Sequence, residues 1–399
     1  MRAVNHWDHW IEEELGRMAE QDLTRELRVV TESAQPVCLH EGKSLLNLSS
    51  NNYLGLAGHP QLADAIRQAI ERGAGAGAPS SRLIVGHEEE TARLESELAN
   101  WQESEATLVF GNGYMANLGV LSSLLGRGDA VFSDRFNHAS IVDGIRLSGA
   151  THYRYRHRDV DHLETHLKKA DQKGIGRKVI VTDAVFSMDG DLAPLQEIVY
   201  LKERYGAALF VDEAHSVGVI GAQGRGLAHE LGIAEQVDLH MGTFSKAFGV
   251  YGAYVAGRRE WIRYLIHTAR SFIYTTALSP VIISAIRRSL QLVQQGDLLR
   301  QDLARKCLYF REELSQCGFR LTHSMTPIIP IVLGESSTTL QFSRRLVECG
   351  ILAVAIRPPT VLRGEARVRF SLMASHRDGD VQEAIRKIGQ IGHECKVIT

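Results

Sequence analysis

The chain has 399 residues, of which 44% are hydrophobic, and its formal net charge is −2. This length and hydrophobic content suffice for one large core and a smaller second domain. The nearly balanced charge excludes the strongly basic surface that binds nucleic acid or an anionic membrane, so neither is expected as a partner.

The cysteines and the N-terminus point to a cellular compartment. Five cysteines lie at positions 38, 307, 317, 349 and 395, without the CxxC spacing of zinc sites or the pattern of a disulfide framework. Reduced thiols are typical of cytoplasmic proteins. Residues 1–8 lack the apolar core of a signal peptide, and no apolar run approaches the roughly 18 residues of a membrane helix. We therefore expect a soluble, cytoplasmic protein without a metal site.

The first part of the chain shows a helical pattern, followed by a short strand and a small-residue stretch. The pattern predicts an amphipathic helix that docks on something larger; its apolar residues are Trp7, Trp10, Ile11, Leu15 and Met18. A short strand is expected at 45–48, a turn at 49–55, and a helix from Pro60 to Gly73. Residues 73–82 form either a loop where backbone approaches a ligand or partner chain, or a plain flexible loop.

The middle of the chain alternates strand and helix patterns. Short apolar runs at 106–110, 130–133, 179–182 and 207–211 read as strands, and 88–101 reads as a helix. Each run is followed by a loop of small or polar residues. This alternation predicts a mostly parallel α/β sheet, with site residues at the carboxyl ends of successive strands.

The pattern changes after about residue 285. A long helix is expected at 298–317, a strand at 328–333, a helix from about 337, and a strand at 352–356. Residues 367–372 alternate polar with apolar side chains, which predicts a half-buried strand, and a helix from 378 closes the chain. We expect an N-terminal segment (1–50), a large domain (51–285) and a small α+β domain (286–399).

An acid and a lysine indicate which kind of chemistry the chain performs. Asp212 directly follows the apolar strand 207–211, and Lys246 lies in a later loop between hydroxyl residues and glycines. Taken singly, the lysine would be a surface group and the acid a helix cap. Together they are what pyridoxal phosphate (PLP) requires: an amine that binds the cofactor and a carboxylate against its pyridinium nitrogen. His138 could stack on the ring or transfer protons, and His215 lies three residues after Asp212.

Residues 111–114 lie between a strand and a helix, where free backbone amides and the helix dipole favour a phosphate. The hydroxyls of Thr243 and Ser245 could assist. The same run through Ala116 fits G-x-G-x-x-A, with Asp134 about twenty residues on, which keeps a nicotinamide-dependent dehydrogenase open as the alternative. That alternative leaves Lys246 and His138 unexplained.

Four motifs in order closely resemble those of the α-oxoamine synthases: 137–140, 185–190, 212–215 and 242–246. The resemblance runs from Asn51 to His376. It implies an α/β PLP-dependent transferase of fold type I, like aspartate aminotransferase, with a large mostly parallel sheet domain and a smaller C-terminal α+β domain. Members of this family condense an amino acid with an acyl thioester and release CO2. Segments 355–361 and 367–369 are most similar to the branch that joins L-alanine to a pimeloyl thioester, carried by CoA or a carrier protein, in biotin biosynthesis; the glycine-using and serine-using branches remain alternatives.

The resemblance also implies roles for individual residues around the cofactor. Lys246 would hold PLP covalently, His138 would stack on its ring, Asp212 would meet the pyridinium nitrogen and His215 the phenolic oxygen; these four form the expected catalytic set. The other residues expected at the cofactor and its phosphate are Ser187, Asn112, Gly113, Tyr114 and Thr243.

Further residues are implied at the substrate and at a subunit interface. Arg369 would bind the substrate carboxylate, a role that a guanidinium suits and that Arg357 could also fill. The residues that match the substrate pocket are Arg25, Asn51 and Thr360. Thr275 and Thr276 match a segment that reaches the phosphate of the partner subunit, which implies a homodimer with shared active sites. A non-catalytic regulatory module of the same fold would need a DNA-binding segment and a basic face, and the chain shows neither.

Overall fold

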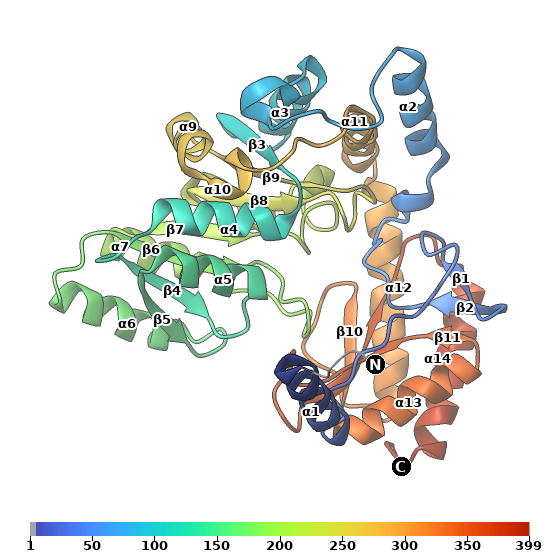
Figure 1. Cartoon of the computed structure of the whole chain (residues 1–399). Coiled ribbons are helices and arrows are strands. Elements are labelled where there is room, and N and C mark those ends of the chain that lie inside the picture. Colours follow the sequence, from blue (N-terminus) through green and yellow to red (C-terminus); the bar gives the residue numbers. More distant parts are fainter. Residues whose placement is uncertain (1–4, 399) are drawn as a thin grey trace. The chain divides into compact units, whose positions relative to one another are not determined.

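The computed structural model describes residues 5–398 (Figure 1). Residues 1–4, the first half of the segment 1–8 that lacks the apolar core of a signal peptide, lie outside the described residues. The chain forms two compact units. One is Asn51–Ala304, and the other joins the segment before residue 51 to the segment from Arg305 onward. Within the described residues, no helix combines the length and apolar character needed to cross a bilayer.

The division differs from the expected one in two places. The expected break at 285/286 falls inside α11 (Pro280–Gln294), which packs against α2 (Pro60–Glu71) and α3 (Glu89–Trp101) and so belongs with the large unit. The first fifty residues do not stand alone, because β2 (Lys43–Asn47) pairs in parallel with β11 (Ile351–Leu352). Both differences arise from contacts between distant parts of the chain.

The large unit is built on a seven-stranded sheet in the order β3-β9-β8-β7-β6-β4-β5. All neighbours pair in parallel except β9, which is antiparallel to both β3 and β8. The strands are β3 (Ala106–Phe110), β4 (Ala130–Asp134), β5 (Thr151–Tyr155), β6 (Lys178–Asp183), β7 (Ala208–Asp212), β8 (Leu239–Thr243) and β9 (Ala253–Gly257). The expected mostly parallel sheet is confirmed, and four of its strands match the predicted ranges to within one residue at each end.

Helices cover both faces of this sheet (Figure 1). Side chains of α4 (Gly113–Leu124), α5 (Ala139–Ser148), α9 (Arg259–Thr268) and α10 (Arg270–Ile273) form one core cluster with the strands. Those of α6 (Val160–Gln172), α7 (Leu195–Tyr205) and α8 (Leu227–Glu230) form the other. Along β7, Phe210 belongs to the first cluster while Leu209 and Val211 belong to the second. A strand buried on both faces is continuously apolar, which is why β6 and β7 could be read from the sequence.

The second unit holds two three-stranded sheets. One has the order β1 (Val37–His40), β2, β11, and the other has the order β10 (Ile328–Gly334), β13 (Ala366–Ser371), β12 (Val354–Ile356). Three further helices are α12 (Asp297–Gln316), which spans the boundary, α13 (Ser336–Glu348) and α14 (Asp378–Glu394). The expected half-buried strand at 367–372 is wrong, because every residue of β13 is buried, including Arg367 (4% exposed) and Arg369 (8%). β13 is the central strand of its sheet and α13 packs against it, so neither edge is open.

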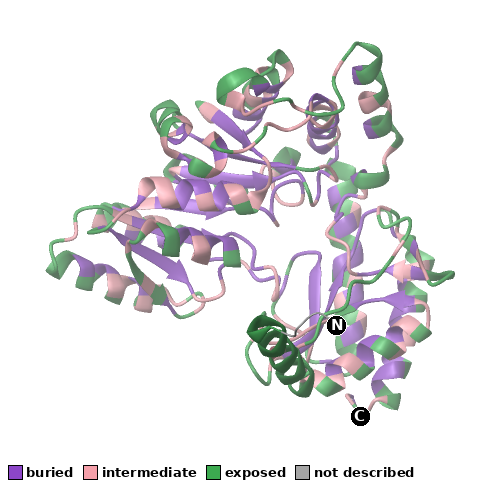
Figure 2. Ribbon diagram, viewed as in Figure 1, coloured by how far each residue is buried: buried purple, intermediate pink, exposed green. Residues whose placement is uncertain are grey.

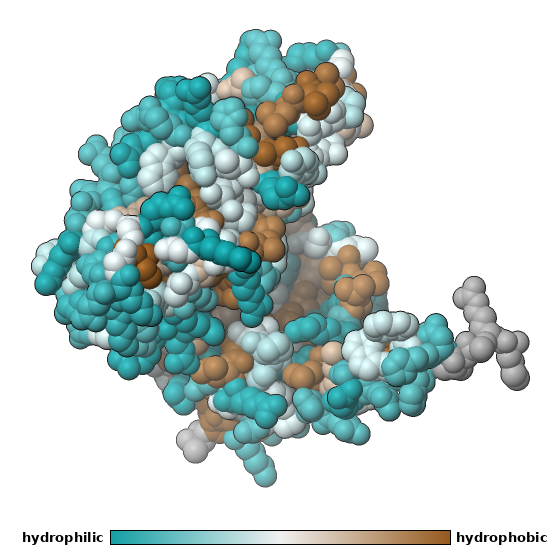
Figure 3. Space-filling model, turned by 60° about the vertical axis from the view of Figure 1, so that its left-hand side comes forward, coloured by the Kyte–Doolittle hydropathy of each residue, from teal (hydrophilic) through white to brown (hydrophobic). Residues whose placement is uncertain are grey.

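The N-terminal helix α1 (His6–Glu20) forms as predicted, and its start is encoded locally. The Asn5 side chain accepts hydrogen bonds from the Trp7 and Asp8 amides, while Asp8 accepts from the Asn5 amide, a capping box. No residue of α1 is buried (Figure 2), and Trp7 is 68% exposed. Exposed apolar side chains also appear as brown groups on the mainly teal surface in Figure 3. No part of the chain between residues 5 and 398 therefore covers the apolar side of α1.

Candidate active site

A pocket in the large unit lies where the parallel strands end. Ten of the residues that the sequence singled out line it together: Asn112, Gly113, Tyr114, His138, Ser187, Asp212, His215, Thr243, Ser245 and Lys246. Five further lining residues had not been predicted: Asn117, Ser140, Asp183, Ala214 and Met241. Because the carboxyl ends of parallel strands share one edge of the sheet, residues far apart in sequence meet there.

Lys246 lies in a tight loop after β8. The Gly249 amide donates to the Lys246 carbonyl oxygen at 3.0 Å, and Gly249 has a φ of +66°. A Cβ at position 249 would lie 2.2 Å from the Ala57 nitrogen, so only glycine allows the two backbones to approach this closely. The loop that carries the lysine is therefore held against the 56–57 segment.

Thr243 closes β8 and is buried. Its hydroxyl donates to the Gly252 carbonyl at 3.0 Å and lies 2.8 Å from the Ser245 hydroxyl, whereas Ser245 itself is exposed. The two hydroxyls thus form a small polar group beside Lys246.

Asp212, at the end of β7, is buried and held at both oxygens. Oδ2 accepts from Asn117 Nδ2 at 2.8 Å, and Oδ1 accepts from the Ala214 amide at 2.9 Å. Asn117, on α4, also donates to the Ser140 hydroxyl at 2.9 Å. The carboxylate is therefore fixed in position from two sides. Asn117 lies one helical turn after Gly113, so its spacing from the expected phosphate loop was a usable signal.

Asp183 is a second buried acid, opposite Asp212 in the parallel register of β6 and β7. Its Oδ2 accepts from the His138 amide at 3.1 Å, while its Oδ1 is buried without a hydrogen-bond partner among the described residues. Burial, and after it the charge of Asp212, raises the pKa of Asp183 well above its usual range. Two carboxyl groups, those of Asp183 and Asp212, therefore lie side by side at this strand edge. An acid ending an apolar strand was the same signal that had identified Asp212.

His138 begins α5 and its side chain is accessible to solvent. Its Nδ1 lies 2.7 Å from the Ser140 hydroxyl, which orients the ring. Although the ring is accessible, the protein atoms packed around it lower the pKa of the imidazole by desolvation; Asp212 acts in the opposite direction and Lys246 lowers the pKa further. The preceding Asn137 ties this loop to β6, since it donates to the Val181 carbonyl at 2.8 Å.

His215 is connected to Asn51 through a tyrosine. The Tyr53 hydroxyl lies 2.7 Å from His215 Nδ1 and donates to Asn51 Oδ1 at 3.2 Å. The Tyr53 ring is fully buried. Sequence reasoning had treated residues 49–55 as a turn that places Asn51 in the substrate pocket. It had missed Tyr53, because nothing local relates this tyrosine to a histidine so far along the chain.

The expected phosphate loop caps α4. Asn112 is the N-cap, its Oδ1 accepting from the Met115 amide at 2.9 Å, and Gly113 and Tyr114 form the first turn. First-turn amides have no partner within a helix and carry the positive end of its dipole, which suits an anion. Asp134, which the dehydrogenase alternative requires at a ribose, is instead buried; it accepts from the amides of Phe136 and Arg158 and contacts His157. The geometry therefore does not favour a dinucleotide.

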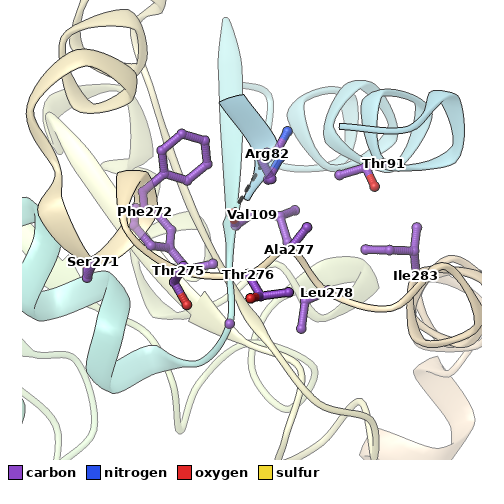
Figure 4. A pocket seen from close by; sticks show the side chains of 12 residues that line it. Arg82, Thr91, Val109, Ser271, Phe272, Thr275, Thr276, Ala277, Leu278 and Ile283 are labelled. Atoms are coloured by element: carbon purple, nitrogen blue, oxygen red, sulfur yellow. Dashed lines mark hydrogen bonds between the residues drawn. The ribbon is translucent and has the colours of Figure 1, made fainter. Parts of the chain in front are cut away.

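Other predicted residues lie elsewhere. Thr275 and Thr276 line a separate small pocket beside Arg82, Phe272 and Val109 (Figure 4), so the structure does not place them in the Lys246 pocket of their own chain. In the second unit, Arg25 and Thr360 are exposed and Arg369 is buried on β13. Arg357 donates to the backbone carbonyls of residues 22 and 24.

The chain is similar to known proteins over most of its length. A family model described as aminotransferase class I and II matches residues 43–388. The 8-amino-7-oxononanoate synthase of Geobacter sulfurreducens is 48% identical over 387 residues, which are 96% of this chain and 98% of the relative.

Two solved structures are similar along the chain. Serine palmitoyltransferase from S. paucimobilis, with a bound PLP–myriocin aldimine, has a TM-score of 0.91 at 28% identity and covers all of both chains. The 8-amino-7-oxononanoate synthase from Francisella tularensis has a TM-score of 0.75 at 30% identity, covering 88% of this chain and 98% of that one. The expected type I fold of PLP-dependent transferases is confirmed. The chain belongs to the class I and II aminotransferase family and, at this level of identity, to the 8-amino-7-oxononanoate synthases among the α-oxoamine synthases.

Proposed function

We propose that this enzyme condenses L-alanine with a pimeloyl thioester, carried by CoA or a carrier protein, to give 8-amino-7-oxononanoate, CO2 and the free thiol, a step of biotin biosynthesis. The relatives of this name, 48% identical along almost the whole chain, support the assignment. The observation that carries it is the meeting of Lys246, Asp212 and His138 in one pocket at the carboxyl edge of the sheet.

The cofactor is PLP, and the pocket offers suitable groups for its aldehyde, its ring nitrogen and its phosphate. A lysine amine is available for the aldehyde, a fixed buried carboxylate for the ring nitrogen, and the first turn of α4 with Thr243 for the phosphate. The buried, unpartnered Oδ1 of Asp183 leaves a polar position for a ligand atom. When bound, PLP supplies an electron sink for charge that develops on the substrate α-carbon.

The proton transfers belong to Lys246 and His138. Once the amino acid has displaced it, the Lys246 amine takes the proton from the α-carbon and later returns it. His138, which lines the same pocket, would lie against the cofactor ring and would donate a proton to the thioester carbonyl oxygen. Desolvation lowers the pKa of its imidazole, so the protonated ring is the stronger acid for this step.

Asp212 and His215 are assigned to the ring nitrogen and the phenolic oxygen of the cofactor. The Asp212 carboxylate, fixed by Asn117 and the Ala214 amide, keeps a proton on the ring nitrogen. The pKa of the neighbouring Asp183 is raised by burial and by Asp212, which makes it a weaker candidate for the ring nitrogen. His215, held by Tyr53, would bind the phenolic oxygen, and Ser187, which lines the same pocket, would contact the cofactor.

The link from His215 to Tyr53 leads to a prediction. In Tyr53→Phe we expect a free energy of unfolding lower by about 1.5 kcal/mol, because a buried hydroxyl loses its hydrogen bonds to His215 and Asn51. A loss of similar size in the transition state corresponds to about ten-fold lower kcat. Urea denaturation and steady-state kinetics measure the two effects, with Tyr200→Phe, at an exposed position of α7, as the matched control. Wild-type values for both would show that the tyrosine hydroxyl has no part in orienting His215.

The substrate carboxylate is assigned to Arg369, with Arg25, Asn51 and Thr360 around the substrate. Arg357, whose guanidinium donates to the carbonyls of residues 22 and 24, is the alternative. A guanidinium binds a carboxylate through two parallel hydrogen bonds, which would fix the bond to be broken on release of CO2.

The active enzyme is proposed to be a homodimer with shared sites, in which Thr275 and Thr276 reach the phosphate bound by the partner subunit. Support comes from apolar side chains that the single chain leaves exposed. They are the apolar residues of α1, the helical turn Arg82–Gly86 with Leu83, Ile84 and Val85, and Tyr274. Exposed apolar groups of this kind mark protein interfaces, and a two-fold dimer would cover both copies.

The proposed function is tested by comparing L-alanine with other amino acids as the substrate. We expect the purified protein to carry visible PLP absorbance that responds to L-alanine, and to release 8-amino-7-oxononanoate, identified by mass spectrometry, when a pimeloyl thioester is added. The kcat/KM for alanine should exceed that for glycine or L-serine by about ten-fold or more, the range that one small side-chain difference supplies. A preference for glycine or serine would move the enzyme to another branch of the family, and failure to bind added PLP would overturn the proposal.

A further inference from the structure

Outside the pocket, His157 bridges two buried acids. It lies in the turn after β5, with Nδ1 3.0 Å from Asp134 Oδ1 and Nε2 2.8 Å from Asp191 Oδ2. Asp134 ends β4, Asp191 lies in the loop after β6, and both are buried. Carboxylates only accept hydrogen bonds, so an imidazole that satisfies both must donate from both nitrogens and carry a positive charge.

The same ring contacts the two loops that carry site residues. Its centroid lies 4.5 Å from the ring of Phe136, two residues before His138, and 4.5 Å from the ring of Phe186, one residue before Ser187. Asp134 also accepts from the Phe136 amide at 2.8 Å. His157 is thus bound to each loop twice, once by a charged hydrogen bond and once by an aromatic contact.

The charges around the ring favour its protonated form. Burial alone disfavours the charged imidazole, but the hydrogen bonds and charges of Asp134 and Asp191 outweigh it and raise the pKa of His157 to about 9. Two arginines lie close by: the Arg158 guanidinium is 3.3 Å from Asp191 Oδ2, and the Arg135 guanidinium lies 4.8 Å from the Phe136 ring centroid, on the loop that packs against His157. Arg158 is half exposed, so it can balance Asp191 only in part.

We propose that His157 is a positioning residue for the reaction: its charged ring ties the loop of His138 to the loop of Ser187 and so holds both side chains at the cofactor. The proposal rests on the proposed function only for the roles of His138 and Ser187. The tie between the loops is a property of the protein alone, and it can be measured without any substrate.

The sign of the pH dependence follows from the raised pKa. A histidine whose pKa is higher in the folded than in the unfolded chain stabilises the fold fully below the unfolded pKa of about 6.5. That contribution is lost as the pH rises through the folded pKa of about 9. Above it the ring keeps a single N–H, so one of the two acids loses its bond and the two loops separate.

The test compares His157→Gln with His152→Gln. His152 lies on the same β5 strand and its Nε2 is 2.7 Å from the Ser133 hydroxyl, a bond to β4 that involves neither loop. The first measurement is the Tm of each PLP-free protein between pH 7 and 10. We expect the gap between wild type and His157→Gln to shrink as the pH rises through about 9, and the His152→Gln gap to stay constant. The second is the Kd for PLP at pH 7, which should rise about ten-fold in His157→Gln only, as for one lost charge-assisted bond.

Two outcomes would overturn the proposal: a Tm gap that does not change with pH, or wild-type PLP affinity in His157→Gln. If that variant does not fold, Asp191→Asn carries the test, because it keeps a hydrogen-bonding side chain and removes one charge. Its alkaline transition should then move to lower pH, and an unmoved transition would contradict the proposal. Loss of PLP binding by the wild type would count against the proposed function, whereas the Tm profile of the PLP-free protein would still test His157.

Discussion

Replacing Lys246 by alanine is expected to lower kcat by about a thousand-fold or more while PLP still binds without a covalent link. The lysine serves twice, as the group that binds the aldehyde and as the base at the α-carbon, and a single general base is typically worth about 10²–10⁴-fold. The phosphate position at α4 and the carboxylate of Asp212 remain in the variant, so affinity for the cofactor should fall much less than turnover.

Single-turnover kinetics with alanine and a pimeloyl thioester measure the rate, and dialysis followed by absorbance measures the retained cofactor. Lys168→Ala, which removes an exposed lysine of α6 that pairs with Glu164, is the matched control and should behave as wild type. Near wild-type turnover in the Lys246 variant would contradict the assignment of this residue.

Asp212→Asn is expected to lower kcat by about 10²–10³-fold, the usual effect of removing one charge placed against the reacting system. The amide has the size of the carboxylate and can still bond the Ala214 amide, but it lacks the charge that keeps a proton on the ring nitrogen. The new amide also places an N–H donor against the Nδ2 donor of Asn117, so the hydrogen bond between these two side chains is lost. We expect the free energy of unfolding to fall by about 1 kcal/mol as a result.

Asp183→Asn is the matched control on the adjacent strand. Burial and the charge of Asp212 raise the pKa of Asp183, so loss of its charge should matter less than loss of the charge at Asp212, and kcat should fall less than about ten-fold. Steady-state kinetics and urea denaturation of both variants are the measurements. Equal losses of kcat in the two variants would mean that the charge at this edge of the sheet does not reside on Asp212.

Much of the fold could be predicted because its signals are local. The strands β3, β4, β6 and β7 are short apolar runs, since burial on both faces demands them. The strands β5, β8 and β9 were not predicted: β5 (Thr-His-Tyr-Arg-Tyr) lies at the edge of the sheet and is mixed in polarity, and the end of β8 had been read as part of the lysine loop. Strand β13 looked half-buried from its alternating arginines, although its central position buries all of it.

The residues of the site likewise divide into those with a local signal in the sequence and those without one. Lys246, Asp212, His138 and His215 could be named from strand ends, small-residue loops and the family motifs, all of which are readable within a few residues. Tyr53 and His157 could not, because each acts through a side chain that is distant in sequence, and the local signal for Asn117 was only its spacing of one helical turn from Gly113. Tyr53 meets His215 162 positions later, and Asn117 meets Asp212 95 positions later.

By itself, the sequence determined the helices α1, α2, α3, α12, α13 and α14, the strands β3, β4, β6 and β7, and the class of cofactor, because capping, periodicity and motifs depend on near neighbours. It also named the residues to which the proposed chemistry is assigned. Only the tertiary structure decided the strand order β3-β9-β8-β7-β6-β4-β5, and with it the pairing of Asp183 beside Asp212 and the clamp of His157 on two loops. Strand order and burial are settled by the packing of the whole chain. The charge state of each acid and histidine in turn depends on which groups that packing brings within a few ångströms.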